Sequence, residues 1–321
     1  MSGGSLNPRA QALLAEVLGP AWRVSAEELI AADGTRVPVQ DGVTRFREED
    51  SYNRSFALQW GAFRTNQLDE VNGSNLSMLR FAETGWTAEM LNGQRVLEAG
   101  CGAGRFTAIL ARLGARLVAL DYSSAVDVSR QNNEEKGEIA FVQADILAMP
   151  FQPGSFDFVF CHGVLQHTPD PERAFHALLR MVRPGGRLSA DIYRKDGLIR
   201  PWKSKYLWRW WTTRIAPDRL LAFLRWFIPK WLPIDTAIKS IPYAGNYLGS
   251  VIPCWNYSNR ALSPEQKREW AIMDTFDALA PAYDLPAHID DVRRWAREAG
   301  LVDAEIRPGG NGVVINAIKP L

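Results

Sequence analysis

The sequence predicts an α/β fold built on a mostly parallel sheet, and three observations carry this prediction. Strand-like and helix-like segments alternate through residues 94–194. Three glycines, Gly100, Gly102 and Gly104, stand between the first of these strands and the helix that follows it. Pro184-Gly185-Gly186 ends the last helix of the series. Strands that alternate with helices favour parallel pairing through right-handed crossovers.

Each element of this region is predicted from its own pattern. Short apolar runs predict strands, and longer runs with helical spacing predict the helices between them. We expect strands at residues 95–98, 116–120, 139–143, 156–161 and 187–193, and helices at residues 105–113, 123–135 and 171–182. Towards the end of the chain we expect a helix at 290–300 and two closing strands at 302–306 and 312–318.

The chain divides into an extension, a core and an insertion. Residues 1–92 form the N-terminal extension, where turn signals predict a small hairpin over 36–46 and helices follow near 52–67 and 76–84. The core takes residues 93–196 and 286–321. Residues 197–285, rich in aromatic and basic side chains, form a helical insertion after the fifth strand of the core.

Size and composition bound the class of protein. A chain of 321 residues with 46% hydrophobic residues can bury a substantial core. A net charge of +1 gives no indication of a nucleic-acid partner. The three cysteines, Cys101, Cys161 and Cys254, form no CxxC pair, so no metal site is expected and a reducing cytoplasm is favoured. Neither a signal peptide nor a membrane-spanning segment is expected.

The glycine-rich loop predicts a site for a nucleotide-like ligand. Glycine lets the backbone turn sharply and lets a ligand approach without a Cβ clash. Glu98 lies two residues before Gly100, where its carboxylate could attract a ligand ammonium group. Dinucleotide-binding strands usually carry an apolar residue at that position, so Glu98 favours a different ligand.

Two further acids follow the next two strands. Asp121 ends the second strand, followed by Tyr122, and its carboxylate could accept both hydroxyls of a ribose. Asp145 follows the third strand and could accept from an adenine amino group, with Ile146 beside the ring. Each acid could instead cap the helical segment that it precedes.

Four motifs, in order, resemble those of class I S-adenosylmethionine-dependent methyltransferases of the Methyltransf_11 kind. They are Val96-Leu97-Glu98-Ala99-Gly100-Cys101-Gly102-Ala103-Gly104, Gln143-Ala144-Asp145, Phe156-Asp157-Phe158-Val159 with Gly163-Val164-Leu165-Gln166-His167, and Val182-Arg183-Pro184-Gly185-Gly186. The resemblance covers about residues 94–194. It implies a Rossmann-like sheet of seven strands, the last antiparallel, and S-adenosylmethionine as cofactor. It places at the cofactor Glu98, Gly100, Cys101, Gly102, Gly104, Asp121, Tyr122, Asp145 and Ile146.

The N-terminal extension carries a second, weaker resemblance. Residues 37–43 resemble the last part of the Trm112-like zinc-ribbon domain that often begins such methyltransferases. Since the extension holds no cysteine, we expect a metal-free remnant of that domain.

Several side chains outside the four motifs are candidates for the same site. Trp60, on the expected helix that also holds Gln59, Phe63 and Gln67, could help to cover the cofactor, although packing is its alternative role. Arg80 could pair with the cofactor carboxylate, and Arg105 is the alternative.

Histidines at the end of the fourth strand are the candidate catalytic residues. His162 and His167 flank the edge of the sheet where ligands of parallel sheets bind. There an imidazole could act as a general base, or it could be a hydrogen-bonded scaffold group. Tyr193 and His288 are weaker candidates.

The insertion has an unusual composition in residues 200–231. Eight basic residues and six tryptophans accompany one acid, Asp218. Such a segment could form a lid over an apolar substrate pocket, a homodimer face, or a peripheral contact with a membrane surface. RNA binding is a further use.

These observations predict methyl transfer from S-adenosylmethionine to a small-molecule or lipid-linked acceptor, with oxygen as the expected atom. Alignment of donor and acceptor and exclusion of water supply most of the catalysis for such a reaction. A methyltransferase of RNA or protein that uses the basic insertion is the first alternative, and a non-catalytic cofactor-binding scaffold is the second. Cys161-His162-Gly163-Val164 stands where enzymes that methylate base amino groups carry Asn-Pro-Pro-Tyr or Asp-Pro-Pro-Tyr.

Overall fold

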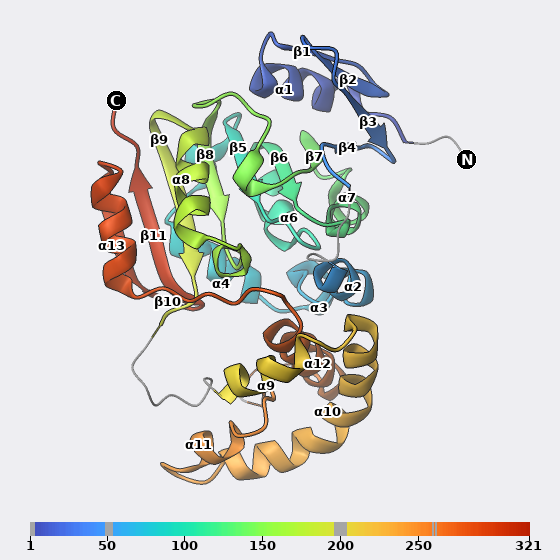
Figure 1. Cartoon of the computed structure of the whole chain (residues 1–321), viewed down its shortest axis with the longest axis vertical. Coiled ribbons are helices and arrows are strands. Elements are labelled where there is room, and N and C mark those ends of the chain that lie inside the picture. The colour runs from blue at the N-terminus through green and yellow to red at the C-terminus, as the bar shows by residue number, and fades with distance from the viewer. Residues whose placement is uncertain (1–3, 49–53, 196–203, 259, 261) are drawn as a thin grey trace. The chain divides into compact units, whose positions relative to one another are not determined.

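A computed structural model describes residues 4–48, 54–195, 204–258, 260 and 262–321. The chain forms two compact units. The first unit comprises Met1–Glu49, Asn75–Lys195 and Leu285–Leu321, and the second comprises Asp50–Ser74 and Asp196–Asp284 (Figure 1). Residues 50–74, expected to belong to the N-terminal extension, thus cluster with the insertion.

The described residues of the first unit form one eleven-stranded sheet. Its strands are β1 (Trp22–Val24), β2 (Glu28–Ala31), β3 (Arg36–Gln40), β4 (Val43–Arg45), β5 (Arg95–Ala99), β6 (Arg116–Asp121), β7 (Ile139–Gln143), β8 (Phe156–Cys161), β9 (Val182–Ile192), β10 (Val302–Gly309) and β11 (Gly312–Ile318). They lie in the order β1-β2-β3-β4-β7-β6-β5-β8-β9-β11-β10.

Seven neighbouring strands of this sheet, from β7 to β10, correspond to the sheet that the sequence predicts. Strands β7, β6, β5, β8 and β9 are parallel, and β11 runs antiparallel between β9 and β10. The order in which strands are added to the sheet reverses at β5, because β6 and β7 lie on one side of it and β8 and β9 on the other. Ligands bind beyond the carboxyl ends of the strands at such a reversal.

The expected total of seven strands is wrong, because the N-terminal extension continues the sheet. The hairpin of β3 and β4 forms around Asp41-Gly42 as predicted, and β4 then pairs in parallel with β7. Strands β1 and β2 extend the antiparallel part further. Because β1 and β2 have only three and four residues, their hydrophobic pattern is too short to identify them from the sequence.

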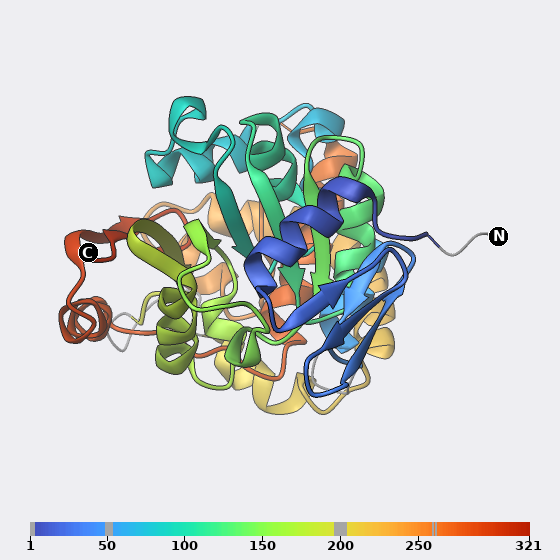
Figure 2. The ribbon, with the colours of Figure 1, turned by 90° about the horizontal axis from the view of Figure 1, so that it is seen from above.

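Helices cover both faces of the sheet (Figures 1 and 2). Their bounds are α1 (Pro8–Leu18), α4 (Leu76–Phe81), α5 (Ala88–Leu91), α6 (Arg105–Arg112), α7 (Ala125–Asn133), α8 (Pro171–Met181) and α13 (Ile289–Glu298), with single 3-10 turns η1 (Ala82–Thr84), η2 (Ile146–Ala148) and η3 (Leu165–His167). Buried side chains of α1, α8 and α13 pack on one face, and those of α4, α5, α6 and α7 pack on the other. The result is a three-layer α/β unit.

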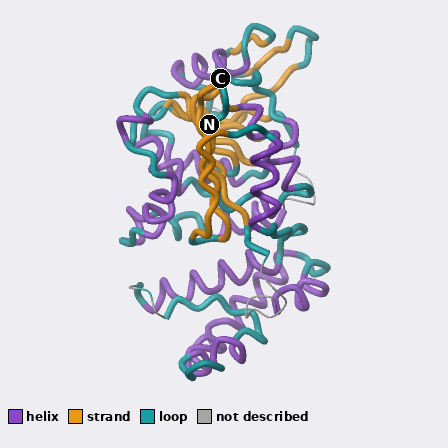
Figure 3. The backbone as a smooth tube through the Cα atoms, turned by 90° about the vertical axis from the view of Figure 1, so that its left-hand side faces the viewer, coloured by secondary structure: helices purple, strands orange, loops and turns teal. Residues whose placement is uncertain are grey.

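In the second unit, all of the regular secondary structure of the described residues is helical (Figure 3). The helices are α2 (Arg54–Ala62), α3 (Asp69–Asn72), α9 (Ser204–Thr212), α10 (Pro217–Lys239), α11 (Gly245–Gly249) and α12 (Pro264–Leu279). Helix α10 packs against α2, α11 and α12. The helix expected over 52–67 is shorter than predicted: Tyr52 lies outside the described residues, and α2 ends at Ala62. No described helix combines the length and the apolar character needed to cross a bilayer.

Candidate functional site

The glycine loop joins the carboxyl end of β5 to the first turn of α6. Gly100, Gly102 and Gly104 have φ angles of 85°, 52° and 88°, a region that favours glycine. A Cβ at Gly100 would lie 2.3 Å from Val164 Cγ2, and one at Gly104 would lie 2.2 Å from Asn133 Nδ2. These two glycines are therefore required by close packing as well as by the backbone.

Glu98 is a buried acid, and only one of its two carboxyl oxygens accepts a hydrogen bond. Its Oε2 accepts a hydrogen bond of 2.6 Å from the Thr107 hydroxyl, and its Oε1 is buried without a hydrogen-bond partner. Burial raises the pKa of Glu98 to about 8, and the neighbouring Asp121 carboxylate acts in the same direction. A buried acceptor that has no hydrogen-bond donor costs free energy. A cationic ligand group that donates a hydrogen bond to Oε1 would remove this cost.

Asp121 ties the end of β6 to the glycine loop. Its Oδ2 accepts from Gly102 N at 2.8 Å, while Oδ1 accepts from Ser123 N at 2.9 Å and from the Ser123 hydroxyl at 2.8 Å. Burial raises its pKa. The carboxylate therefore shapes the loop and the entry to α7. Oδ1 already accepts two hydrogen bonds, so the acceptor capacity that remains is on Oδ2, because each carboxylate oxygen has two lone-pair sites.

The predicted adenine-side residues lie along the same edge of the sheet. The Arg47 guanidinium stacks over the Tyr122 ring, 3.2 Å from its centroid. Asp145 accepts from Leu147 N at 2.8 Å and so caps η2, which was the alternative role expected for it. Ile146 is buried. Cys101 is buried too, and burial raises the pKa of its thiol well above the usual value.

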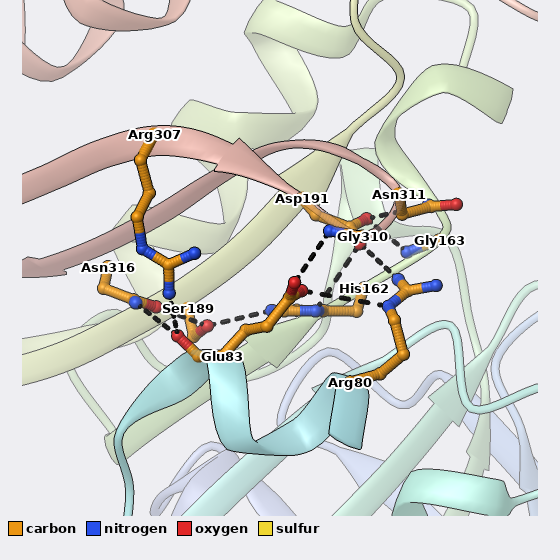
Figure 4. Close-up of polar contacts among 10 residues, drawn as sticks. All are labelled: Arg80, Glu83, His162, Gly163, Ser189, Asp191, Arg307, Gly310, Asn311 and Asn316. Atoms are coloured by element: carbon orange, nitrogen blue, oxygen red, sulfur yellow. Dashed lines mark hydrogen bonds and ion pairs between the residues drawn. The ribbon is translucent and has the colours of Figure 1, made fainter. Parts of the chain in front are cut away.

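Arg80 forms an ion pair within the protein. Its Nη2 lies 2.5 Å from Asp191 Oδ2, at the carboxyl end of β9 (Figure 4). The other Asp191 oxygen accepts from Gly163 N at 2.6 Å and from Asn311 Nδ2 at 3.4 Å. Burial opposes the charge on Asp191, but Arg80 and the Gly163 N–H hold its pKa below the usual value. Arg105, the alternative partner for a cofactor carboxylate, lies in the first turn of α6.

His162 belongs to the same network and has no exposed side-chain surface. Its Nδ1 lies 3.5 Å from Asp191 Oδ2, and its Nε2 shares a hydrogen bond of 2.9 Å with Ser189 Oγ. Ser189 donates in turn to Asn316 on β11 (Figure 4). The ring stacks on Phe160 with centroids 4.4 Å apart, and burial lowers the pKa of His162 to about 4. These are the features of a neutral scaffold imidazole.

His167 ends η3 at the carboxyl edge of the sheet. Its ring contacts the ring of Tyr193 edge-on, with ring centroids 5.6 Å apart. The candidate base His167 and the weaker candidate Tyr193 are therefore neighbours. Both follow strands whose carboxyl ends are neighbours, β8 and β9. His288, the other weaker candidate, immediately precedes α13.

The helix predicted to cover the cofactor belongs to the second unit. In α2, Gln59 is buried and Trp60 is half-buried, while Phe63 just beyond its end is buried beneath the Arg225 guanidinium. These residues contribute to the helical packing of that unit, so the covering role of Trp60 stays a prediction.

Sequence reasoning missed Asp191, Ser189 and Thr107. A signal for the first two exists, because Leu188, Ala190 and Ile192 are buried apolar residues that alternate with them along β9. Such alternation predicts a polar row on one face of a strand, here the face towards Arg80. Thr107 shows no such signal, since a threonine on an apolar helix face is ordinary.

The core of the protein resembles a known family of enzyme domains. Residues 97–190 match the family described as the methyltransferase domain, and this segment is a methyltransferase domain. The chain is 40% identical over 105 residues to the ubiquinone biosynthesis O-methyltransferase of Xanthomonas euvesicatoria, covering 30% of this chain and 42% of that protein. It is 36% identical over 126 residues to the demethylmenaquinone methyltransferase of Clavibacter sepedonicus, covering 39% of this chain and 50% of that protein.

A solved structure shares the fold. The phosphoethanolamine N-methyltransferase 2 of Haemonchus contortus, in complex with S-adenosyl-L-methionine, aligns with a TM-score of 0.50 and 15% identity over 89% of this chain and 63% of that one. The chain spans half the length or less of the curated relatives named here. The family match over residues 97–190 includes the glycine loop.

Proposed function

We propose that the protein transfers the methyl group of S-adenosylmethionine to a small-molecule or lipid-linked acceptor, through an oxygen atom of that acceptor. The observation that carries the proposal is the buried Glu98 Oε1, which has no hydrogen-bond partner and lies two residues before the glycine loop. An aliphatic ammonium group, such as that of the methionine part of the cofactor, would satisfy it.

The other residues of the loop edge fit the same ligand. The N–H groups at the start of α6 and the positive φ angles of the loop suit close approach of a polar ligand. Asp121 would accept from a ribose hydroxyl with the remaining lone pair of Oδ2, and Tyr122, Asp145 and Ile146 would surround the adenine. Arg80 is held by Asp191, so a cofactor carboxylate would have to compete with that ion pair for its guanidinium, and Arg105 remains the alternative.

The cofactor when bound supplies an activated methyl group on a sulfonium. The protein then has to orient the acceptor in line with the breaking bond and to exclude water. An acceptor hydroxyl of high pKa must also lose its proton, and we assign that role to His167. His162 is better placed as a positioning residue, because its ring is buried between Asp191 and Ser189.

The proposed acceptor class rests on the relatives. One is named for ubiquinone biosynthesis and another for demethylmenaquinone, both lipid-linked ring compounds. A hydroxylated aromatic ring with an apolar tail is therefore the acceptor class to test first.

Calorimetric titration with S-adenosylhomocysteine tests the cofactor site. We expect Glu98→Gln to weaken binding by about 10- to 100-fold, the range for a hydrogen bond to a charged group. Glu16→Gln, at a solvent-exposed acid, is the matched control and should bind as the unaltered protein does. Equal affinity of Glu98→Gln and the unaltered protein would overturn the assignment. Binding without homocysteine-product formation on any phenolic acceptor would instead support the scaffold alternative.

A further inference from the structure

Helix α10 of the second unit has two apolar faces. Leu220, Leu221, Leu224 and Ile228 are buried and form its inner face. A second set recurs at spacings of three and four residues and so shares another face of the helix. We name this set the outer stripe, and it consists of Phe223, Trp226, Phe227, Lys230, Trp231 and Ile234.

Part of the outer stripe is open to solvent, while Phe227 and Trp231 are half-buried. Phe223 is 50% exposed, Trp226 60% and Ile234 50%. The rings of Phe223, Phe227 and Trp231 stack in sequence along the helix, with centroids 5.4 and 5.9 Å apart. A helix that only covers a core is polar on its far side, so exposed apolar side chains beside a stacked aromatic row indicate a surface that binds a ligand or partner.

Helix α9 exposes the same kind of side chain, and cations accompany both helices. Leu207 is 80% exposed and Trp210 67%. Lys230 Nζ lies 3.8 Å from the centroid of the Trp226 ring, and Arg214 Cζ lies 4.9 Å from that of Trp210.

The exposed charge of these two helices is positive. Within residues 204–239 the exposed basic residues are Arg214, Arg219, Arg225 and Lys230, against the single exposed acid Asp218. The other acid, Asp235, is buried and paired with Lys239 at 2.9 Å. The acids of these two helices therefore neutralise little of the exposed positive charge, which can attract an external anion.

We propose that the outer stripe of α10 docks on the surface of an anionic lipid bilayer. Aromatic rings with a cation beside them suit the boundary between headgroups and acyl chains, where tryptophan is enriched and basic side chains meet lipid phosphates. A second copy of the chain is a poorer occupant, because a symmetric dimer through this face would bring the same cations together. Docking would place the protein where a lipid-linked acceptor resides.

Vesicle co-sedimentation of the full chain tests the proposal. The vesicles are phosphatidylcholine alone, or an equimolar mixture of phosphatidylcholine and phosphatidylglycerol. We expect binding to the mixed vesicles at low ionic strength, weak binding to phosphatidylcholine, and loss of binding in high salt. Lys230→Gln should weaken partition by about fivefold, and Trp226→Ser by about tenfold or more. Arg9→Gln and Val302→Ser, at exposed positions of the first unit, are the matched controls and should bind unchanged.

Three results would overturn the proposal. They are absence of binding to the mixed vesicles at low salt, equal loss in Trp226→Ser and Val302→Ser, or a dimer in sedimentation velocity that Trp226→Ser abolishes while no variant binds vesicles. Affinity for S-adenosylhomocysteine is measured on every variant. Failure of vesicle binding with intact nucleoside affinity refutes the docking surface alone, whereas absence of nucleoside affinity in the unaltered protein refutes the proposed function.

Discussion

Arg80 donates to Asp191 over 2.5 Å, and this ion pair joins α4 to the carboxyl end of β9. The same carboxylate accepts from Gly163 N at 2.6 Å, so it also fixes the loop that follows β8. Because the Asp191 side chain has no exposed surface, its charge depends on these donors. The pair therefore holds together the segments that frame the edge of the sheet where the acceptor would enter.

Replacing Arg80 should destabilise the protein strongly. Arg80→Met leaves Asp191 as a buried charge with fewer donors, and breaking a buried ion pair in this way costs about 3 kcal/mol. Urea unfolding of the variant, followed by the change in tryptophan fluorescence, measures this loss in the free energy of unfolding.

The exposed pair between Arg36 and Glu28 is the control for Arg80→Met. Their side chains are 69% and 36% exposed, so Arg36→Met should change the free energy of unfolding by less than about 1 kcal/mol. If both substitutions changed the free energy of unfolding by the same small amount, the network in Figure 4 would not stabilise the fold as we expect.

The alternation of strands and helices made the core predictable, while the network did not follow from the sequence. Glu98 and Asp121 could be found because they lie at fixed places beside a glycine loop in one continuous stretch of chain. The pairing of Arg80 with Asp191 joins residues 111 positions apart, and it depends on how α4 packs on the sheet. Neither residue has a local pattern that names its partner. Strands β1 and β2 were missed because each is too short for its periodicity to be read, whereas the hairpin of β3 and β4 was found from its turn signal.

Binding of S-adenosylhomocysteine should depend on pH through Glu98. Burial raises the pKa of Glu98 to about 8, so at pH 7 the free protein holds this carboxyl mostly neutral. A bound ammonium group favours the ionised carboxylate, and binding near pH 7 then releases a proton. Affinity should rise by up to tenfold per pH unit below pH 8 and level off above it.

Calorimetry in buffers of different ionisation enthalpy measures the released proton. In Glu98→Gln both the proton release and the slope of affinity with pH should vanish. A proton that is still released by that variant would assign the titration to another group, of which the nearby Asp121 is the first to examine.

Gly104 should tolerate no side chain. Gly104→Ala places a methyl group at a φ of 88° and 2.2 Å from Asn133 Nδ2, so the buried Asn133 and Ser129 side chains of α7 must shift. Backbone strain of about 1–2 kcal/mol adds to that packing cost. The midpoint temperature of thermal unfolding and the affinity for S-adenosylhomocysteine should both fall.

Gly93→Ala separates the two costs. Gly93 has a φ of 73° and nothing within 4 Å of an added Cβ, so the variant should carry the backbone strain alone. Equal loss of stability in Gly93→Ala and Gly104→Ala would show that the packing of α6 on α7 does not require glycine.

His167 and His162 should respond differently to substitution. His167→Ala should lower kcat by about 100-fold or more on a phenolic acceptor of high pKa, since general base catalysis contributes on that scale. Its affinity for S-adenosylhomocysteine should change little, while its free energy of unfolding should fall somewhat, because the His167 ring is buried against Tyr193. On an acceptor that is already ionised the loss should be small, a difference that a merely structural role would not produce.

His162→Ala should instead reduce stability, because it leaves a cavity beside Phe160 and removes a partner of Ser189. His162→Gln, which can still hydrogen-bond, should recover part of that stability and most of the activity. Loss of kcat in a stable His162→Gln, with His167→Ala fully active, would reverse the two roles and make His162 the base.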